Sequence, residues 1–265
     1  MADFPTRIAR VTLRCSDVEA SAESYAGLVG LEIASLGAEE ARLCSPGGDE
    51  PCLVLRRAER PGQAPRRASG LFHTAFRYPT RAGLAAALQR IGELDARFSG
   101  AADHGVSEAL YLDDPDGLGI ELYRDRPRDE WPAAGPGERV RMFTAPLDLK
   151  DLASSAAAAE ESERGLPGAG VDVGHVHLKV ADTAAAERFW TESIGLDLMT
   201  RFGDDAIFLA RDGYHHHVGA NSWQSRGAER EPLSGPGLDE VALYADSPTP
   251  TAVTPDGIPV ATIVA

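Results

Sequence analysis

Apolar and polar residues alternate from Arg10 and again from His175, and this period of two predicts a β-strand at each place. In both stretches an aspartate follows, and a run of about 12 residues with helical character then leads to a glycine. The aspartates are Asp17 and Asp182, and the glycines are Gly30 and Gly195. The pattern therefore predicts one strand–helix–strand unit that is repeated at a constant offset of 165 residues.

Two weaker copies of this unit begin near residues 73 and 240. The first runs from His73 through a predicted helix at Thr80–Ile91 to strands near Glu108–Leu112 and Gly119–Tyr123. The second copy, Gly237–Ala265, leaves no room for a helix. The pattern thus predicts an α+β fold of four βαβββ modules, of which the fourth is truncated.

Residues 126–172 interrupt the repeat with a segment rich in proline, glycine, alanine and charged residues. Such a composition is typical of a connector, and we expect one short helix in it, at Leu147–Glu160. The chain then divides into modules one and two at 1–125, the connector at 126–172, and modules three and four at 173–265.

Charge narrows the classes of partner. The 265 residues include 41 acidic and 26 basic side chains, a net charge of −15, which argues against nucleic acid and against anionic membranes. The cysteines, Cys15, Cys44 and Cys52, form no CxxC pair, which argues against a disulfide framework or a zinc site. With no apolar run of about 20 residues and no signal-peptide pattern, we expect a cytoplasmic protein.

Five stretches together resemble the vicinal oxygen chelate superfamily, which includes glyoxalase I, bleomycin-resistance proteins and extradiol ring-cleaving dioxygenases. They are Gly70–Phe76, Asp103–Gly117, Gly119–Pro127, Gly174–Asp182 and Gly213–Gly219. Within the superfamily, the chain is most similar to the catechol 2,3-dioxygenase-like proteins of the Bacillus type. The resemblance implies that the four modules form two cupped mixed sheets, with metal ligands on the first and fourth strands of a module.

Ligand types are concentrated in the two central modules. The second offers His73 and Glu121 and the third offers His175, whereas the first offers only Arg10 and the fourth only Glu240. Alternate residues of a strand point into a cup, so one residue from each strand can reach a common centre. We therefore predict that modules two and three share a metal-binding cup, and that modules one and four form a metal-free one.

Together, His73, His175 and Glu121 would form a 2-His-1-carboxylate face, whose open positions suit Fe(II), with Mn(II) as the alternative. Two neutral imidazoles and one carboxylate leave the ion a positive charge, so a catecholate and O₂ could both coordinate. His177 lies two residues from His175 and faces the same side, so either could be the ligand; the module alignment selects His175.

A fourth inward position decides between two chemistries. The module alignment places His217 in the position that corresponds to Glu121. The resemblance implies that glyoxalase-like enzymes have a carboxylate there, which serves as the fourth metal ligand. A histidine there favours a dioxygenase, because its pKa lies near working pH and it can shuttle a catechol proton. Strand alternation puts His215 and His217 inward and His216 on the opposite face, although the three could also form a surface tract.

Two further roles follow from the resemblance alone. His104 lies 17 residues before Glu121 and Tyr111 lies 10 before it, spacings similar to those of extradiol enzymes. The inferred role of His104 is to deprotonate or anchor a catechol oxygen. The inferred role of Tyr111 is to form a hydrogen bond with the substrate, although Tyr111 could equally well be a residue of the apolar core. Four aromatic residues are candidates for pocket or core: Phe76, Phe208, Trp223 and Trp190, with the core favoured for Trp190.

These observations favour an Fe(II)-dependent extradiol dioxygenase that acts on a catechol-type aromatic diol and O₂. One alternative is a non-catalytic protein that binds and sequesters an aromatic metabolite or antibiotic. Another is a metal-dependent isomerase or lyase of the glyoxalase kind. The resemblance also implies that the chain can form a homodimer.

Overall fold

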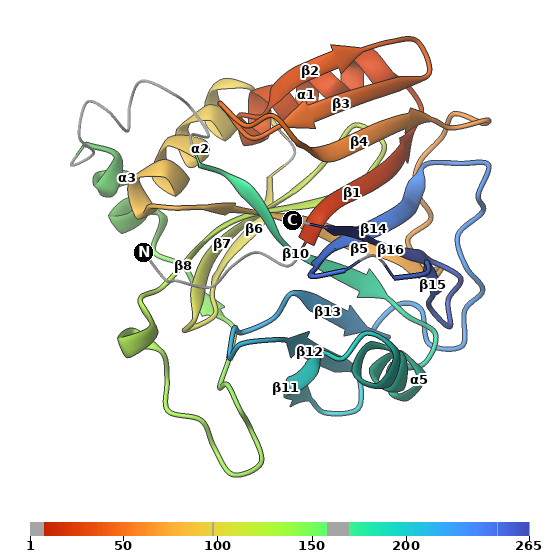
Figure 1. Cartoon of the computed structure of the whole chain (residues 1–265). Coiled ribbons are helices and arrows are strands. Elements are labelled where there is room, and N and C mark those ends of the chain that lie inside the picture. Colours follow the sequence, from red (N-terminus) through yellow and green to blue (C-terminus); the bar gives the residue numbers. More distant parts are fainter. Residues whose placement is uncertain (1–7, 97, 158–169, 248, 265) are drawn as a thin grey trace.

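Four structural modules follow one another along the chain in a computed structural model, which describes residues 8–96, 98–157, 170–247 and 249–264. Figure 1 shows the first module, in red and orange, beside the fourth in dark blue, with the second and third modules beside each other below them. The α+β fold of four modules in two curved mixed sheets is confirmed.

The first two modules contain one helix each. The first is β1 (Ile8–Cys15), α1 (Val18–Val29), β2 (Glu32–Leu36), β3 (Glu40–Cys44) and β4 (Pro51–Arg57). The second is β5 (Gly70–Tyr78), α2 (Arg81–Glu93), β6 (Phe98–Asp103), β7 (Ser107–Asp113) and β8 (Gly119–Asp125).

The third module repeats the pattern with a shorter α-helix. It consists of β10 (Asp172–Lys179), α5 (Thr183–Arg188), the π-helical turn η2 (Phe189–Ser193), β11 (Asp197–Phe202), β12 (Ala206–Ala210) and β13 (Val218–Asn221). The fourth consists of β14 (Gly237–Ala245), β15 (Ala252–Val253) and β16 (Pro259–Val264), and its described residues contain no helix.

Between the second and third modules, the described part of the connector contains three short elements. These are a 3₁₀ turn, η1 (Arg128–Glu130), the strand β9 (Ala145–Pro146) and the helix α3 (Leu149–Ala157). The expected helix at Leu147–Glu160 corresponds to α3, and its last three residues lie outside the described part. The helix α3 packs against α2, and β9 pairs with β6. These elements of the connector therefore pack against the second module.

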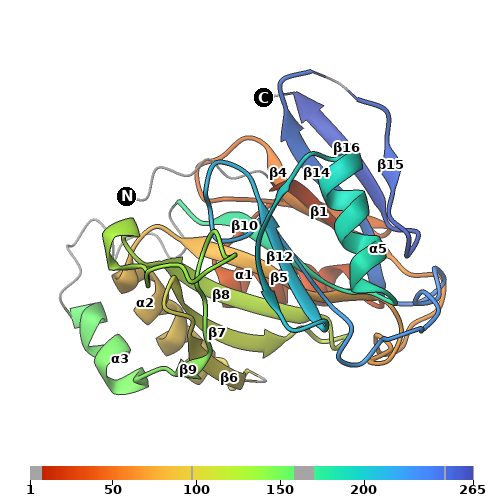
Figure 2. The same cartoon turned by 90° about the horizontal axis from the view of Figure 1, so that it is seen from below.

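Strand order shows how the modules combine. One sheet has the order β15-β16-β14-β1-β4-β3-β2, and the other has the order β11-β12-β13-β10-β5-β8-β7-β6-β9. The second and third modules therefore contribute to the same sheet, joined by the antiparallel pair β5 and β10, and the first and fourth are joined in the same way by β1 and β14. Figure 2 shows β10, β5 and β8 passing side by side through the middle of the molecule.

Local sequence explains the helix boundaries. Asp17 accepts a hydrogen bond from the backbone N–H of Ala20 and so caps the start of α1, and Asp182 caps α5 in the same way. Gly30 ends α1 with a φ of 85°, a left-handed conformation that glycine adopts without strain. In the third module the helix ends in η2, which carries the buried Trp190.

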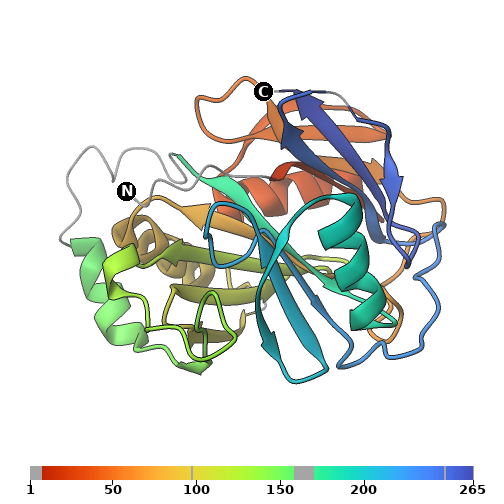
Figure 3. The same cartoon turned by 60° about the horizontal axis from the view of Figure 1, so that its bottom comes forward.

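A shared apolar core lies between the helices and the two sheets, which Figure 3 shows meeting at an angle. Tyr25 from α1 contacts Phe76 from β5, with ring centroids 6.0 Å apart, and both side chains are buried. Phe76 and Trp190 thus belong to the core. Cys15, Cys44 and Cys52 are buried, free thiols. No described helix has the length and apolar character needed to span a lipid bilayer.

Candidate metal centre

Three adjacent strands bring the predicted ligands together. His73 lies on β5, Glu121 on β8 and His175 on β10, the central strands of the nine-stranded sheet. In the parallel pair of β5 and β8, Ala75 lies opposite Glu121. Ala75 is two residues from His73 and therefore points to the same face, so Glu121 lies on the same face of the sheet as His73, two residues further along. The repeated strand pattern therefore places all three side chains over one point of the cup.

The donor atoms of these residues converge. His73 Nε2 and His175 Nε2 lie 2.8 and 3.2 Å from Glu121 Oε2, and donor atoms of all three lie within 4.8 Å of one another. His73 Nε2 is buried and makes no hydrogen bond of acceptable geometry. Buried polar atoms normally have a hydrogen-bond partner, so a buried nitrogen without one, next to a carboxylate, is suited to bind a metal ion. Among the described residues, this is the group of three that could hold a metal ion.

Burial and the neighbouring side chains together set the protonation states of Glu121 and His175. Burial acts to raise the pKa of Glu121, but the adjacent His175 and His73 outweigh it and hold that pKa well below its ordinary value. Burial lowers the pKa of His175 to about 4, although Glu121 opposes the shift. The groups are therefore a carboxylate and a neutral imidazole at neutral pH, the forms in which these side chains bind metals.

His177 has a different partner. It lies opposite His73 in the antiparallel pair of β5 and β10, and the two rings meet edge to face at 5.0 Å. Its Nε2, however, lies 3.0 Å from Nδ2 of Asn221, so this nitrogen accepts a hydrogen bond from the amide. The geometry therefore groups His175, rather than His177, with Glu121.

His104 and Tyr111 form a pair beside the metal face. His104 Nε2 lies 2.7 Å from the Tyr111 hydroxyl, and His104 Nδ1 lies 2.8 Å from the Phe143 carbonyl. Tyr111 is opposite Glu121 across β7 and β8. Burial, reinforced by Glu121, raises the pKa of Tyr111 well above its ordinary value, so the phenol stays protonated. The structure thus brings both predicted residues to the site.

The expected orientation of the histidine run is wrong. His217 does not line the cavity; its ring packs on Tyr214 with centroids 4.8 Å apart, and its Nδ1 accepts a hydrogen bond from the Arg211 N–H. His216 lines the cavity instead, although alternation predicted that it would face away. The reason is that β13 begins only at Val218, so the alternation of a regular strand does not govern residues 214–217.

Strand pairing also moves the fourth inward position. His177 lies opposite Gly219 across β10 and β13, just as Ala75 lies opposite Glu121 across β5 and β8. Gly219, not His217, is therefore the counterpart of Glu121. A Cβ at Gly219 would lie 2.9 Å from the ring of His177, so that ring fills the place of a fourth ligand.

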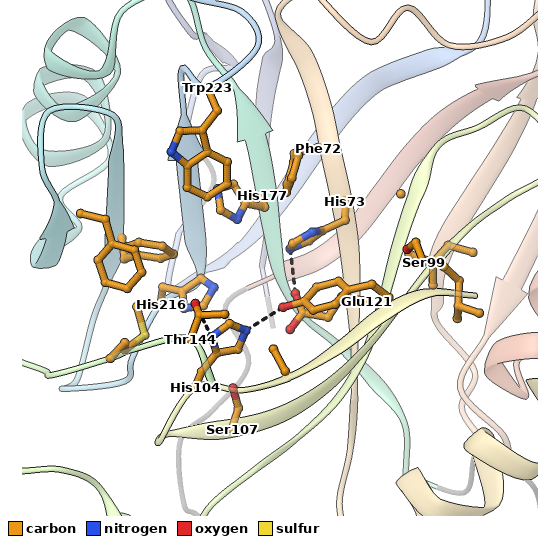
Figure 4. A pocket seen from close by; sticks show the side chains of 18 of the residues that line it. Phe72, His73, Ser99, His104, Ser107, Glu121, Thr144, His177, His216 and Trp223 are labelled. Carbon is orange, nitrogen blue, oxygen red and sulfur yellow. Dashed lines mark hydrogen bonds and ion pairs between the residues drawn. The ribbon is translucent and has the colours of Figure 1, made fainter. Parts of the chain in front are cut away.

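The metal face opens into a cavity of about 420 Å³. Figure 4 shows His73, Glu121, His177 and His216 pointing into this space, with Trp223 at its upper end. The apolar side chains that line it include Phe72, Met142, Phe202, Phe208 and Trp223. Among the described residues, no lysine or arginine lines it. The cavity can therefore hold an aromatic compound against the metal face.

Comparison with known proteins agrees with this geometry. The sequence model of the Glyoxalase/Bleomycin resistance protein/Dioxygenase superfamily matches residues 7–122. The chain is 36% identical over 236 residues to a catechol-2,3-dioxygenase of Bacillus subtilis (strain 168), covering 88% of this chain and 81% of the relative. The chain belongs to this superfamily. This relationship confirms the resemblance described from the sequence and the expectation of a dioxygenase-type enzyme.

Solved structures in the superfamily share the fold. A dioxygenase candidate of Bacillus subtilis superposes with a TM-score of 0.62 at 13% identity, covering 98% of this chain and 86% of that one. Glyoxalase I of Zea mays superposes with a TM-score of 0.59 at 14% identity, covering 97% and 92%. At these identities the similarity concerns the fold alone.

Several site residues were not predicted from the sequence. No role in the site was assigned from the sequence to Phe72, Met142, Asp125 or His216, although all but Met142 lie in the stretches that resemble the superfamily. The only available signal was the run of three histidines, which was assigned the wrong orientation. Phe208 and Trp223, by contrast, were candidates and do line the cavity.

Proposed function

We propose that the chain is an extradiol dioxygenase that opens the ring of a catechol-type aromatic diol with O₂. The observation that carries the proposal is the His73–Glu121–His175 face at the end of an aromatic-lined cavity. Relationship to a catechol-2,3-dioxygenase supports it. The same face supports Fe(II) as the resident ion, with Mn(II) as the alternative, because two imidazoles and one carboxylate suit non-haem iron.

The three-ligand face favours a dioxygenase over a glyoxalase-like isomerase or lyase. A carboxylate that serves as the fourth metal ligand would have to come from the position of Gly219. This residue has no side chain, and the His177 ring covers it. Three protein ligands leave open positions for both oxygens of a diol and for O₂. Fe(II) bound here would supply electron transfer between the diol and O₂, and the protein would supply the proton transfers and the orientation.

His104 and Tyr111 can take a proton from one diol hydroxyl. The Phe143 carbonyl only accepts, so His104 Nδ1 carries the hydrogen that it donates there. In neutral His104 the Nε2 is then an acceptor and receives the hydrogen bond of the Tyr111 hydroxyl. The Tyr111 oxygen can in turn accept a hydrogen bond from the substrate, and a proton passed along this line comes to rest on His104 Nε2.

His216 is proposed as the acid–base group on the opposite side of the cavity, in the role first assigned to His217. Asp125 Oδ1 lies 2.8 Å from His215 Nε2, and His215 Nδ1 lies 2.8 Å from His216 Nδ1. Because the carboxylate accepts from His215 Nε2–H, neutral His215 accepts from His216 Nδ1–H. The free lone pair of His216 is then on Nε2 and can accept a substrate proton, and Asp125 stabilises the resulting charge through His215.

Oxygen consumption tests the proposed function. The protein is loaded with Fe(II) without air, given catechol, and then exposed to O₂ while oxygen uptake and the yellow ring-opened product are recorded. We expect one molecule of O₂ consumed for each diol opened, and no uptake by Glu121→Ala. Tight binding of catechol without uptake would instead identify a sequestration protein, and turnover without oxygen consumption would identify an isomerase or lyase.

A further inference from the structure

A second, open cavity of about 760 Å³ adjoins the metal-site cavity, because Trp223 lines both. The side chain is half exposed, as expected for a residue between a buried cavity and an open one. The outer cavity is lined by arginines from two segments, Arg66 and Arg67 before β5 and Arg226 after β13, together with Asp205.

Charge sets this outer cavity apart from the rest of the protein. The whole chain has a net charge of −15, yet three arginines and one aspartate line this cavity. Arg226 forms an ion pair with Asp205. Among the described residues, no ion pair or hydrogen bond involves the guanidinium of Arg66 or Arg67. Two adjacent unpaired guanidinium groups are suited to bind a carboxylate or a phosphate.

The backbone that carries these arginines is held in place. The buried Lys179 donates from Nζ to the carbonyls of Pro65, at 2.7 Å, and Arg66, at 3.4 Å. One residue earlier, the Ala64 N–H donates to the Asp116 carbonyl at 2.8 Å. A loop fixed at both points loses less conformational freedom when its side chains bind a ligand, which raises the affinity that two exposed arginines can provide.

We propose that the outer cavity is a subsite for an anionic group, carboxylate or phosphate, on the distal end of the aromatic diol. This inference rests on the proposed function of the inner cavity. The diol would lie at the His73–Glu121–His175 face, where no described arginine or lysine lines the wall. An apolar body would lie along Phe72 and Trp223, whose rings meet edge to face at 5.7 Å, and the anion would lie beyond the indole.

Matched probes isolate the contribution of charge. They are catechols with an unbranched alkyl chain that ends in a carboxylate, in a phosphate monoester or in a neutral carboxamide. Binding to the Fe(II)-loaded protein is measured by calorimetry without air, and ring opening by oxygen uptake. The variants are Arg66→Ala/Arg67→Ala and, as the control, Arg60→Ala, an exposed arginine of the same loop that lines neither cavity.

In the wild type and in Arg60→Ala, we expect the better anionic probe to bind about five- to tenfold more tightly than the carboxamide. The double variant should lose this ratio without weaker carboxamide binding, and so should the wild type in about 1 M salt, where the Debye length is near 3 Å. The tighter of the two anions identifies the chemical class. Equal binding of all three probes by the wild type would overturn the subsite, as would an equal loss in Arg60→Ala. Charge discrimination without ring opening would instead overturn the proposed function and leave the subsite standing.

Discussion

His216 stacks over His175, with ring centroids 4.0 Å apart and an angle of 50° between the rings. This contact places His216 beside the proposed metal face and in the cavity wall, whereas His217 packs behind it on Tyr214. We predict that His216→Ala lowers kcat by about 10²- to 10⁴-fold, the usual range for loss of an acid–base group. His217→Ala should change kcat by less than about threefold, because its effect is limited to packing.

Iron content and kinetics of the two variants are the measurements that check this prediction. Both should retain iron near the wild-type level, since neither residue belongs to the His73–Glu121–His175 group. A loss of turnover in His217→Ala as large as that in His216→Ala would contradict the assignment. Unchanged turnover in His216→Ala would remove the acid–base role altogether.

The choice of ligand between His175 and His177 has its own test. His175 Nε2 faces Glu121, whereas His177 Nε2 is occupied by Asn221. We predict that His175→Ala weakens Fe(II) binding by more than about 100-fold, beyond the range expected for a supporting residue, and that His177→Ala weakens it by at most about tenfold. Metal content after dialysis against a graded chelator gives both affinities. The reverse order would exchange the two assignments.

The fold and the metal group follow from patterns that a single sequence displays. Period-two alternation puts His73 and His175 on the first strands of their modules, and the turn-to-strand spacing puts Glu121 on a fourth strand. The fourth position failed because the link between β12 and β13 differs in length from its counterpart before Glu121, so aligning the turns shifted His217 into the place of Gly219. The register between neighbouring strands depends on how their side chains pack, and an alignment of turn residues gives no information about that packing.

Packing at Gly219 leads to a third prediction. A Cβ there would lie 2.9 Å from the His177 ring, which is closer than side chains approach, and the ring is hemmed in by Phe72 and Phe208. We expect Gly219→Ala to lower the free energy of unfolding by about 1–3 kcal/mol through overpacking. Urea denaturation measures the change. Gly92→Ala on the exposed face of α2 is the control, because a Cβ there meets nothing within 4 Å and should stabilise the helix.

If Gly219→Ala were as stable as the wild type, the His177 ring would have to move easily. The proposed reason for a three-ligand face would then fail, because a side chain at this position would be tolerated. A lower stability together with unchanged iron affinity would match the arrangement described, in which His177 fills the fourth position without binding the metal.

Asp114, in the turn that joins β7 to β8, provides a test by pH. Its side chain is buried, and burial raises its pKa to about 7, although the N–H groups of Leu118 and Asp116 oppose the shift. A carboxyl group whose folded pKa exceeds its unfolded value of about 3.9 binds more protons in the folded state between those two pH values. Its contribution to stability is therefore fully present below about pH 4 and is lost as the pH rises through about 7.

Asp114→Asn isolates this contribution, because an amide keeps the shape of the neutral acid and does not ionise. We predict that the unfolding free energy of the variant relative to the wild type increases by a few kcal/mol between about pH 4.5 and 7.5, since each unit of pKa shift corresponds to about 1.4 kcal/mol. Other titrating groups, including His175 with its lowered pKa, act in both proteins and cancel in the difference. Urea titrations of the two proteins across this range give the measurement. A difference that stays constant with pH would show that Asp114 is already ionised in the folded protein and that its backbone hydrogen bonds outweigh its burial.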